Sequence, residues 1–329
     1  MIKTVKVRLR PTTSQETKLW QSAGVSRFAY NWAVAYQIEN YKNGGKFIYD
    51  CELRRKFTEV KRQPEYLWLY ETSNNIPKQA IKDACNAYLR FFQKKAGKPK
   101  FKSKRRSKPS FFNDPVKLKY KDGKFLIEKV GWVRISEKER IIASKFYNPH
   151  IKHDGKYWYI NVGIDFEKPK SELTGETVGI DIGIKDLAVC SNGMQFKNIS
   201  KEKNAKTQAK KLCRLKRQVW RKYQKNKEGG KLAKTANIFK LEKKIKLINR
   251  KIANIRIDHI HQATTSIVKT KPSRVLIASL NVQKMMKNRY LAKAIRAQGL
   301  YKFKITMKYK CKFHGIEFVE SDKLQAHSE

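Results

Sequence analysis

The first part of the chain shows one strand pattern followed by several helical patterns. Residues 1–10 alternate apolar and basic side chains with the period of a β-strand. A capping box at Thr13 to Glu16 precedes apolar residues at helical spacing, which predict a helix over 14–41. A shorter helix is predicted over 50–62, and Pro77 is expected to open a third. These helices predict a small helical subdomain.

The next stretch changes to a strand pattern. Residues 94–109 are rich in Lys and Arg and poor in apolar residues, so they are predicted to be a solvated linker or an arm that orders on phosphates. Within 110–165, Asp122-Gly123 and Asp154-Gly155 each separate two alternating runs, which is a strong hairpin signal. We expect a compact β domain, with the first strand added at its edge.

The second half alternates between strands and helices. An apolar strand pattern over 177–189 precedes helical patterns over 200–261, and these predict two helices packed as a coiled-coil-like hairpin. The rest predicts a strand over 275–282, a helix over 291–314 and a strand over 316–321. This order is the one expected of an RNase H-like sheet: a strand pair, a helical insertion, a strand, a helix and a strand. The fold class predicted for the whole chain is multi-domain α+β.

The charge indicates a polyanionic partner. The net charge is +47 and the pI is about 10.1, with 75 Lys and Arg against 28 acidic residues. Charge spread over the whole sequence favours a long or structured RNA over a single DNA contact face, although a ribosomal-type basic protein is an alternative. The predicted hairpin has basic outward faces, which are either solvated surface or a track for phosphates. The basic residues that we expect to bind nucleic acid there are Lys210, Arg214, Arg217 and Arg221.

Cysteine spacing and hydropathy limit the remaining classes. The 5 cysteines include no Cys-x-x-Cys pair, so neither a disulfide framework nor a zinc ribbon is expected from them. The first residues lack the apolar run of a signal peptide, and no stretch of the chain has the length of a membrane span. We therefore expect a cytoplasmic protein with no membrane partner.

Asp181 is the main candidate for metal chemistry. It is a carboxylate in the middle of a mostly apolar strand pattern, and cleavage of a phosphodiester with two Mg²⁺ ions needs several carboxylates. In the strand that should supply the next acid, Ala278 and Ser279 stand instead. One alternative is that Glu320 or Asp322 replaces the lost acid. Another is an actin-like sugar kinase, which the scarcity of Gly-rich phosphate loops and the basic charge disfavour.

Four motifs in order resemble the TnpB family of transposon-encoded RNA-guided nucleases with a RuvC-type domain. They are Val5 to Pro11, Arg27 to Trp32, Gly179 to Ala188 and Leu280 to Arg289. The resemblance implies a wedge-like β-barrel over 1–10 and 110–172, and a helical recognition domain with a basic linker over 11–109. It also implies an RNase H-like (RuvC) domain over 173–329, with its helical insertion at about 200–261 and no zinc ribbon.

The same resemblance implies which acids would act. The family uses three, of which Asp181 matches the first, Ala278 stands at the second, and the chain ends before the third. The pattern is closest to the TnpB-like nuclease-dead repressors (TldR). The implied function is RNA-guided binding of double-stranded DNA beside a short motif, where an R-loop represses a promoter. We therefore expect no enzyme activity, no zinc, no requirement for Mg²⁺, and a transposon-derived guide RNA held by a monomer or by a pair of chains. An active RNA-guided endonuclease with a relocated carboxylate is the alternative.

The resemblance also suggests residues that read nucleic acid. The positions matching the family's motif-reading residues are Tyr49, Asn75, Ile76, Gln79 and Asn113. Asn and Gln can bond adenine bidentately and Ile can pack on a thymine methyl, although a cap, a turn or core packing is the alternative for each. Arg27 and Tyr30 are candidates for stacking on RNA, as is Trp32, for which core packing is equally expected.

Overall fold

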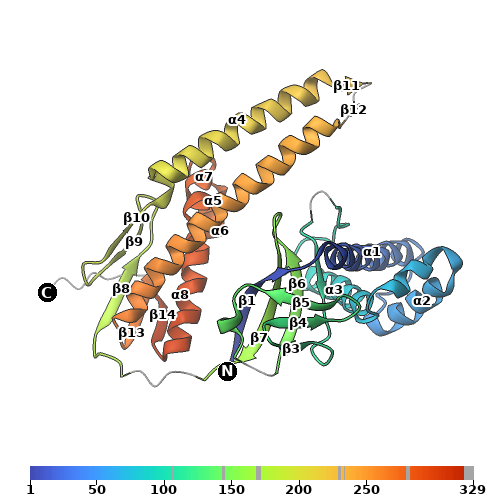
Figure 1. Ribbon diagram of the computed structural model, residues 1–329. Helices are drawn as coiled ribbons and strands as arrows, with labels where there is room; N and C mark the ends of the chain where they lie inside the picture. Colours follow the sequence, from blue (N-terminus) through green and yellow to red (C-terminus); the bar gives the residue numbers. More distant parts are fainter. Residues whose placement is uncertain are drawn as a thin grey trace. The chain divides into compact units, whose positions relative to one another are not determined.

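The computed structural model describes most of the chain as two compact units. The described residues are 1–104, 107–142, 145–167, 172–228, 231–232, 234–278 and 282–321. The first unit is Met1–Phe166 and the second is Glu167–Glu329 (Figure 1). Both units combine helices with β-sheet, so the α+β class is confirmed. Within the described residues, no helix is both long enough and apolar enough to cross a membrane.

A seven-stranded antiparallel sheet forms the base of the first unit. Its order is β2-β6-β7-β1-β5-β4-β3. The strands are β1 (Ile2–Arg10), β2 (Ser110–Phe112), β3 (Lys119–Lys121), β4 (Lys124–Ile127), β5 (Gly131–Ile135), β6 (Tyr147–His153) and β7 (Trp158–Asp165). The expectation that the first strand lies at an edge is wrong, because β1 pairs with β7 and with β5. Its apolar side chains Val5, Val7 and Leu9 are buried, which a central position requires.

Both hairpins predicted from turn residues are present. Between β3 and β4, Asp122 and Gly123 have φ values of 49° and 73°. Two consecutive left-handed residues are the requirement of a two-residue hairpin turn, which explains the Asp-Gly pair. Between β6 and β7, the Oδ1 atom of Asp154 accepts hydrogen bonds from the backbone N of Lys156 and of Tyr157, both at 3.0 Å. The turn signals in the sequence therefore located both hairpins correctly.

Three α-helices and a 3-10 helix complete the first unit. They are α1 (Thr13–Lys42), α2 (Asp50–Arg62), η1 (Pro64–Glu71) and α3 (Asn75–Phe92), with a one-turn η2 at Lys138–Arg140. The capping box lies one residue earlier than predicted, because the Thr12 side chain accepts from the backbone N of Gln15 at 3.3 Å. Pro77 stands in the first turn of α3, where its missing N–H costs no helical hydrogen bond. Helices α1 and α3 pack along each other.

A five-stranded sheet lies at the centre of the second unit. Its order is β10-β9-β8-β13-β14. The strands are β8 (Thr177–Asp181), β9 (Asp186–Cys190), β10 (Gln195–Lys197), β13 (Arg274–Ala278) and β14 (Glu317–Ser321). Strands β8, β13 and β14 are parallel, whereas β9 is antiparallel to β8 and β10 is antiparallel to β9. The predicted strand over 275–282 ends early, since Val282 already begins a helix and 279–281 lie outside the described residues.

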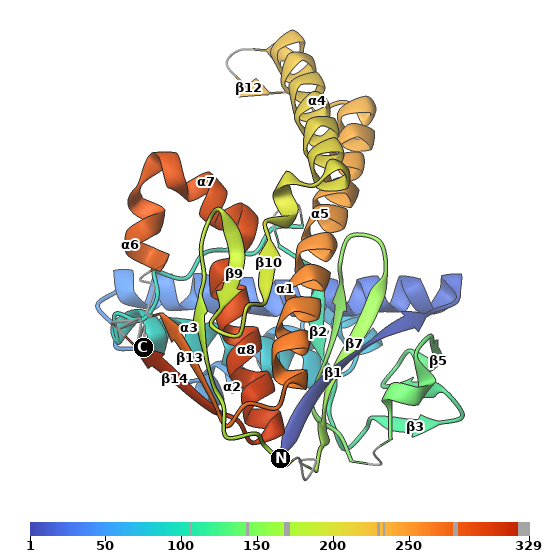
Figure 2. The same cartoon turned by 90° about the vertical axis from the view of Figure 1, so that its left-hand side faces the viewer.

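Two long helices extend from this sheet as a hairpin. Helices α4 (Lys203–Lys225) and α5 (Ala236–Lys269) run side by side, joined near the tip by β11 (Lys227–Glu228) and β12 (Lys231–Leu232), as Figure 1 and Figure 2 show. The short η3 (Ile199–Lys201) precedes α4. The predicted hairpin is therefore confirmed, and α5 continues beyond the predicted end at 261 because Ile260, Ile267 and Val268 are buried in the core of the unit.

The C-terminal helical segment is broken into pieces. It consists of α6 (Val282–Lys287), α7 (Arg289–Gln298) and α8 (Leu300–His314), where a single helix over 291–314 was predicted. Gly299 separates α7 from α8 with φ 76°, a left-handed conformation that ends a helix. Apolar spacing continues through the break, so periodicity alone did not reveal it. Helix α8 packs on α5 and on β14.

Candidate nucleic-acid interface and the Asp181 site

Asp181 stands at the carboxyl end of β8 in the five-stranded sheet. Its neighbour Ile180 is fully buried, and successive side chains of a strand point to opposite faces. Asp181 is exposed and pairs in register with Val189, which is 42% exposed. The carboxylate is therefore solvated and accessible to an ion.

The loop that follows Asp181 is held by two buried amide side chains. The Nε2 atom of Gln298, a residue that is 1% exposed, donates to the backbone O of Gly183 at 3.4 Å and of Ile184 at 3.2 Å. The Nδ2 atom of Asn198 donates to the O of Ile184 at 2.8 Å. These two residues were not identified from the sequence, because a buried amide has no distinctive spacing. They fix the backbone directly after the carboxylate.

Ala278 ends the strand beside Asp181. Ile277 is in register with Ile180. The residues that follow them, Ala278 on β13 and Asp181 on β8, therefore occupy equivalent positions. The structure therefore places the two predicted site positions on neighbouring strands at the same edge of the sheet. The adjoining position where an acid was sought, Ser279, lies outside the described residues.

Glu320 does not replace an acid at this site. It is in register with Ile277, so it shares the face of Ile180 and Ile277 rather than the face of Asp181. Its carboxylate pairs with Nζ of Lys304 at 2.5 Å and of Lys308 at 3.8 Å, both on α8. The other proposed substitute, Asp322, lies outside the described residues.

Within the described ranges, no group of three or more His, Cys, Asp or Glu side chains could hold a metal ion. A site for two Mg²⁺ ions needs several carboxylates or other oxygen ligands. The described residues supply Asp181 and therefore do not fit such a site by themselves.

Two of the predicted base-reading residues make hydrogen bonds within the first unit. Asn75 Nδ2 donates to Oδ2 of Asp114 at 2.9 Å. Asn113 is 2% exposed; its Nδ2 donates to the O of Asp114 at 2.9 Å, and its Oδ1 accepts from the N of Glu128 at 3.2 Å. The structure brings Asn75 and Asn113 together around Asp114. Because both the Nδ2 and the Oδ1 atom of the buried Asn113 are hydrogen-bonded within the protein, its contacts match the turn or packing role given as the alternative to base reading.

The other three differ in their exposure. Tyr49 is the N-cap residue of α2 and is 62% exposed, so its ring is accessible. Gln79 donates from Nε2 to Oδ1 of Asp83 at 2.8 Å, one turn along α3. Ile76 is 2% exposed and belongs to the core, where its side chain cannot reach a thymine methyl. Ile76 therefore follows the packed-residue alternative.

The predicted stacking residues on α1 are largely covered. Tyr30 is 7% exposed, and Nζ of Lys102 lies 3.6 Å from its ring centroid. Burial raises the pKa of Tyr30 and lowers the pKa of Lys102. Trp32 packs edge-on against Phe57 with ring centroids 4.9 Å apart, in line with the core alternative. Arg27 is half-buried.

Helix α4 presents a basic stripe that faces solvent. Lys210, Arg214, Arg217 and Arg221 are all exposed, and their spacing of three and four residues places them on one face of the helix. The half-buried seam residues lie on the opposite face and are Leu212, Leu215, Val219 and Tyr223. In the described part of the chain, none of the four stripe residues forms an ion pair. Unpaired cations on a projecting helix can neutralise phosphates.

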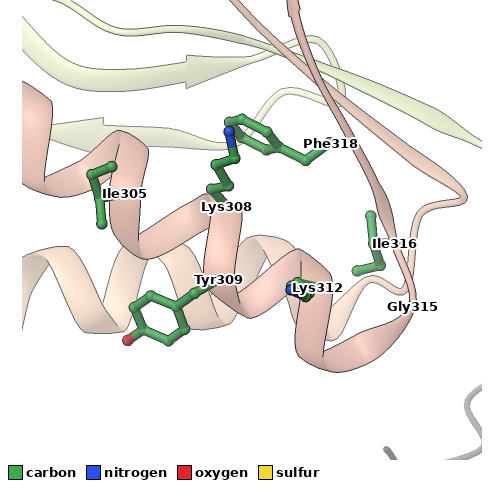
Figure 3. Close-up of a pocket in the computed structure, with 7 residues that line it drawn as sticks. All are labelled: Ile305, Lys308, Tyr309, Lys312, Gly315, Ile316 and Phe318. Carbon is green, nitrogen blue, oxygen red and sulfur yellow. The ribbon is translucent and has the colours of Figure 1, made fainter. Parts of the chain in front are cut away.

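A shallow hollow of about 470 Å³ lies between α8 and β14. Its lining residues are Ile305, Lys308, Tyr309, Lys312, Gly315, Ile316 and Phe318 (Figure 3). Beside it, Nζ of Lys310 donates to the O of His261 at 2.7 Å and to the hydroxyls of Thr264 and Thr265 at 2.7 and 2.6 Å. Burial lowers the pKa of Lys310 to about 8. These hydrogen bonds join α8 to α5, which gives the half-buried Lys310 a structural role.

The fold and these surfaces define a class of basic, two-unit α+β proteins suited to binding nucleic acid. Two family models match the chain: one described as "Helix-turn-helix domain" over residues 1–46 and one as "Probable transposase" over residues 159–289, both of the IS605 OrfB type. In the structure, the first of these regions is a strand and one uninterrupted helix rather than a helix-turn-helix.

Curated relatives match most of the chain. A protein of Escherichia coli K12 named "Putative RNA-guided DNA endonuclease InsQ" is 31% identical over 285 residues, which cover 86% of this chain and 67% of the relative. A "Putative RNA-guided DNA endonuclease" of Streptomyces pristinaespiralis is 25% identical, with 97% of this chain and 77% of the relative covered. The chain belongs to the TnpB (IS605 OrfB) family.

A solved structure has a similar fold. The protein chain in the cryo-EM structure of a Cas12f1–sgRNA–target DNA complex has a TM-score of 0.60 and 14% identity, with 97% of this chain and 89% of that chain covered. At this identity the similarity concerns the fold alone.

The expectation that this chain is not an enzyme is corrected by the relatives. It rested on Ala278 and on the third acid missing before Glu329. The family members that match 86% and 97% of this chain are named as endonucleases.

Proposed function

We propose that this protein is an RNA-guided DNA endonuclease of the TnpB type. It binds a structured guide RNA, which pairs with one strand of a DNA duplex beside a short motif that the protein reads. The observation that carries the proposal is the match to the E. coli relative, 31% identical over 285 residues. The net charge of +47 supports a long polyanionic partner, since each phosphate contact releases counterions.

The two units have separate parts in this proposal. The helices and the seven-stranded sheet of the first unit, which we assign as recognition and wedge domains, carry the exposed Tyr49 and the Asn75–Asp114 contact. We assign the second unit as the RuvC-type domain, with Asp181 as one metal-binding carboxylate. The basic stripe of α4 would follow a phosphate backbone. Further metal ligands would come from outside the described residues, where Asp322 is one candidate.

Repression by occupancy is a second candidate function. An R-loop formed at a promoter blocks RNA polymerase through binding, whether or not a strand is cut. The exposed stripe on α4 would serve repression as well as it serves cleavage, because binding there does not involve Asp181.

The test of the proposed function begins with the RNA that co-purifies with the protein. Its sequence should contain one constant structured part and one variable end. A DNA duplex matching that end should bind the complex, while a duplex with a scrambled match should not. Binding that ignores the match would leave only a general basic protein, and a match beside a promoter would support the repressor role.

A further inference from the structure

We propose that an aromatic cluster at the ends of α1 and α3 is a stacking platform for unpaired bases of the bound RNA. The proposal rests on the guide-RNA function proposed above and adds a binding site to it. The aromatic platform consists of Tyr41, Phe47, Tyr49, Tyr88, Phe91 and Phe92. These residues come from three segments: the end of α1, the loop before α2, and the last turn of α3.

The rings form one connected array around Phe92. Its centroid lies 5.6 Å from that of Phe47, 6.1 Å from Tyr41, 6.1 Å from Tyr88 and 5.7 Å from Phe91. Phe47 in turn lies 5.2 Å from Tyr49. These spacings are typical of interacting aromatic pairs. The array therefore continues from the end of α1 to the start of α2.

Much of the platform faces solvent. The exposed fractions are 40% for Tyr41, 62% for Tyr49, 36% for Phe91 and 46% for Phe92. Tyr88 is 2% exposed and anchors the array in the core. A contiguous exposed aromatic patch on a folded protein marks a surface that a partner covers.

A buried side chain fixes the platform in advance. Gln37, with no exposed surface, accepts at Oε1 from the N of Ile48 at 3.3 Å and donates from Nε2 to the O of Ile48 at 2.5 Å. Ile48 stands between Phe47 and Tyr49, so this clamp sets the backbone that carries both rings. Pre-ordered rings lose less entropy when a ligand stacks on them.

The charge around the platform selects the partner. The exposed cations on its three segments and directly after α3 are Lys42, Lys46, Arg90, Lys94 and Lys95. Within the described part of the chain, none of the five is in an ion pair. A second copy of a chain with charge +47 would be repelled from such a surface. Flat apolar rings bordered by free cations fit unpaired nucleotides, whose bases stack while their phosphates pair with lysine.

RNA is the nucleic acid that we assign to the platform, including Tyr49, for which the sequence had suggested reading of a DNA motif instead. In the proposed function the guide RNA remains bound throughout, whereas target DNA binds and leaves. A permanently bound strand keeps the aromatic rings covered, as their exposed apolar surface requires. Proteins commonly bind unpaired RNA segments by stacking bases on aromatic side chains.

The experiment crosslinks the full-length protein to its co-purified RNA with ultraviolet light. Nuclease digestion and mass spectrometry then locate the nucleotide adducts, which we expect on the peptides carrying Phe47 and Phe92. In parallel, binding of a short unstructured oligouridine is measured for a Phe47→Leu, Phe92→Leu double variant. We expect about tenfold weaker binding, the lower part of the range for base stacking.

Two control variants make the result specific. Tyr290→Leu removes an aromatic ring that is 93% exposed on α7, outside the platform, and should change binding less than about twofold. Phe92→Trp keeps a stacking ring and should bind within about twofold of the unmodified protein, so it reports on the site even where the double variant folds poorly.

Several results would overturn the platform. They are adducts absent from both peptides, adducts to deoxyribonucleotides of added target DNA alone, a crosslinked dimer through these peptides, or equal weakening in Tyr290→Leu. Absence of any co-purified RNA would instead count against the proposed function. In that case the oligouridine measurement still decides whether the platform stacks bases.

Discussion

Asp181 and Glu320 lie on opposite faces of the five-stranded sheet. Glu320 pairs in register with Ile277 and Ile277 with Ile180, so Glu320 shares the face of residue 180, and the next residue of β8 points the other way. The ion pairs of Glu320 with Lys304 and Lys308 keep its carboxylate on the side of α8. Asp181 and Glu320 are therefore close in strand register, but one carboxylate faces solvent and the other faces the lysines of α8.

Substitution of these two acids should give opposite results. Under the proposed function, Asp181→Asn should lower guide-directed DNA cleavage by about a thousandfold, because the carboxylate assigned to metal binding is lost and such a ligand contributes several kcal/mol. Glu320→Gln should leave cleavage within about twofold, with a loss of up to about 1 kcal/mol of unfolding free energy from a partly exposed ion pair. The rates are measured on the RNA-bound protein with one matched duplex. Equal loss of cleavage in both variants would show that Glu320 takes part.

The basic stripe of α4 should set the salt dependence of nucleic-acid binding. Replacing Arg214 and Arg217 with Ala should reduce the slope of log K against log salt by about 0.7 to 0.9 for each phosphate that the variant no longer neutralises. The double Lys variant of the same two positions keeps the charge and serves as the control. Affinity is measured over a salt series. An unchanged slope in the Ala variant would show that these two arginines contact no phosphate and are only solvated.

Two glycines should respond oppositely to alanine. Gly299 has φ 76°, and a Cβ there would lie 3.0 Å from Cδ of Arg256, so Gly299→Ala should destabilise the second unit by at least about 1 kcal/mol. Gly24 lies inside α1, and apart from its chain neighbours and the nearby backbone of the helix itself, nothing lies within 4 Å of an added Cβ. Gly24→Ala should stabilise the first unit by about 0.5 to 1 kcal/mol. Urea unfolding, with the transition of each unit fitted separately, measures both. Destabilisation by Gly24→Ala would contradict the placement of Gly24 in the interior of α1 with space for a methyl group.

Lys310 should make stability depend on pH above neutrality. Its pKa in the folded protein is lowered from 10.5 to about 8 by burial, so between these values the unfolded chain holds a proton that the folded protein has released. The free energy of unfolding should therefore rise with pH over this window. Lys310→Met removes this contribution, while Lys312→Met, at an exposed position, retains it. The stability of the unmodified protein relative to Lys310→Met should increase between pH 8 and pH 10; a constant difference would contradict the lowered pKa.

Local patterns in the sequence predicted most helices and hairpins. The helix predicted over 50–62 is α2, and the Asp122-Gly123 turn stands where the hairpin signal placed it. These features depend on neighbours along the chain. The central position of β1 depends instead on pairing with β7, more than 140 residues away, which no local pattern encodes. The break at Gly299 was hidden because apolar residues continue at helical spacing on both sides.

The sequence indicated Asp181 as the candidate site residue but not the surroundings that the structure gives it. Asp181 was identified because a lone acid in an apolar strand is unusual. The position of Glu320 on the other face required strand register, which a shift of one residue would invert. The clamp of Gln298 on the loop after Asp181 joins residues more than 110 positions apart, and the burial of Asn113 likewise emerged only from packing.

The most direct test of the proposed function is cleavage by the RNA-bound protein. The complex is incubated with Mg²⁺ and a duplex that matches the variable end of its RNA beside candidate motifs. We predict a cut product that requires the match and disappears with Asp181→Asn. A matched duplex that is bound but stays intact would contradict the endonuclease function and leave repression by occupancy.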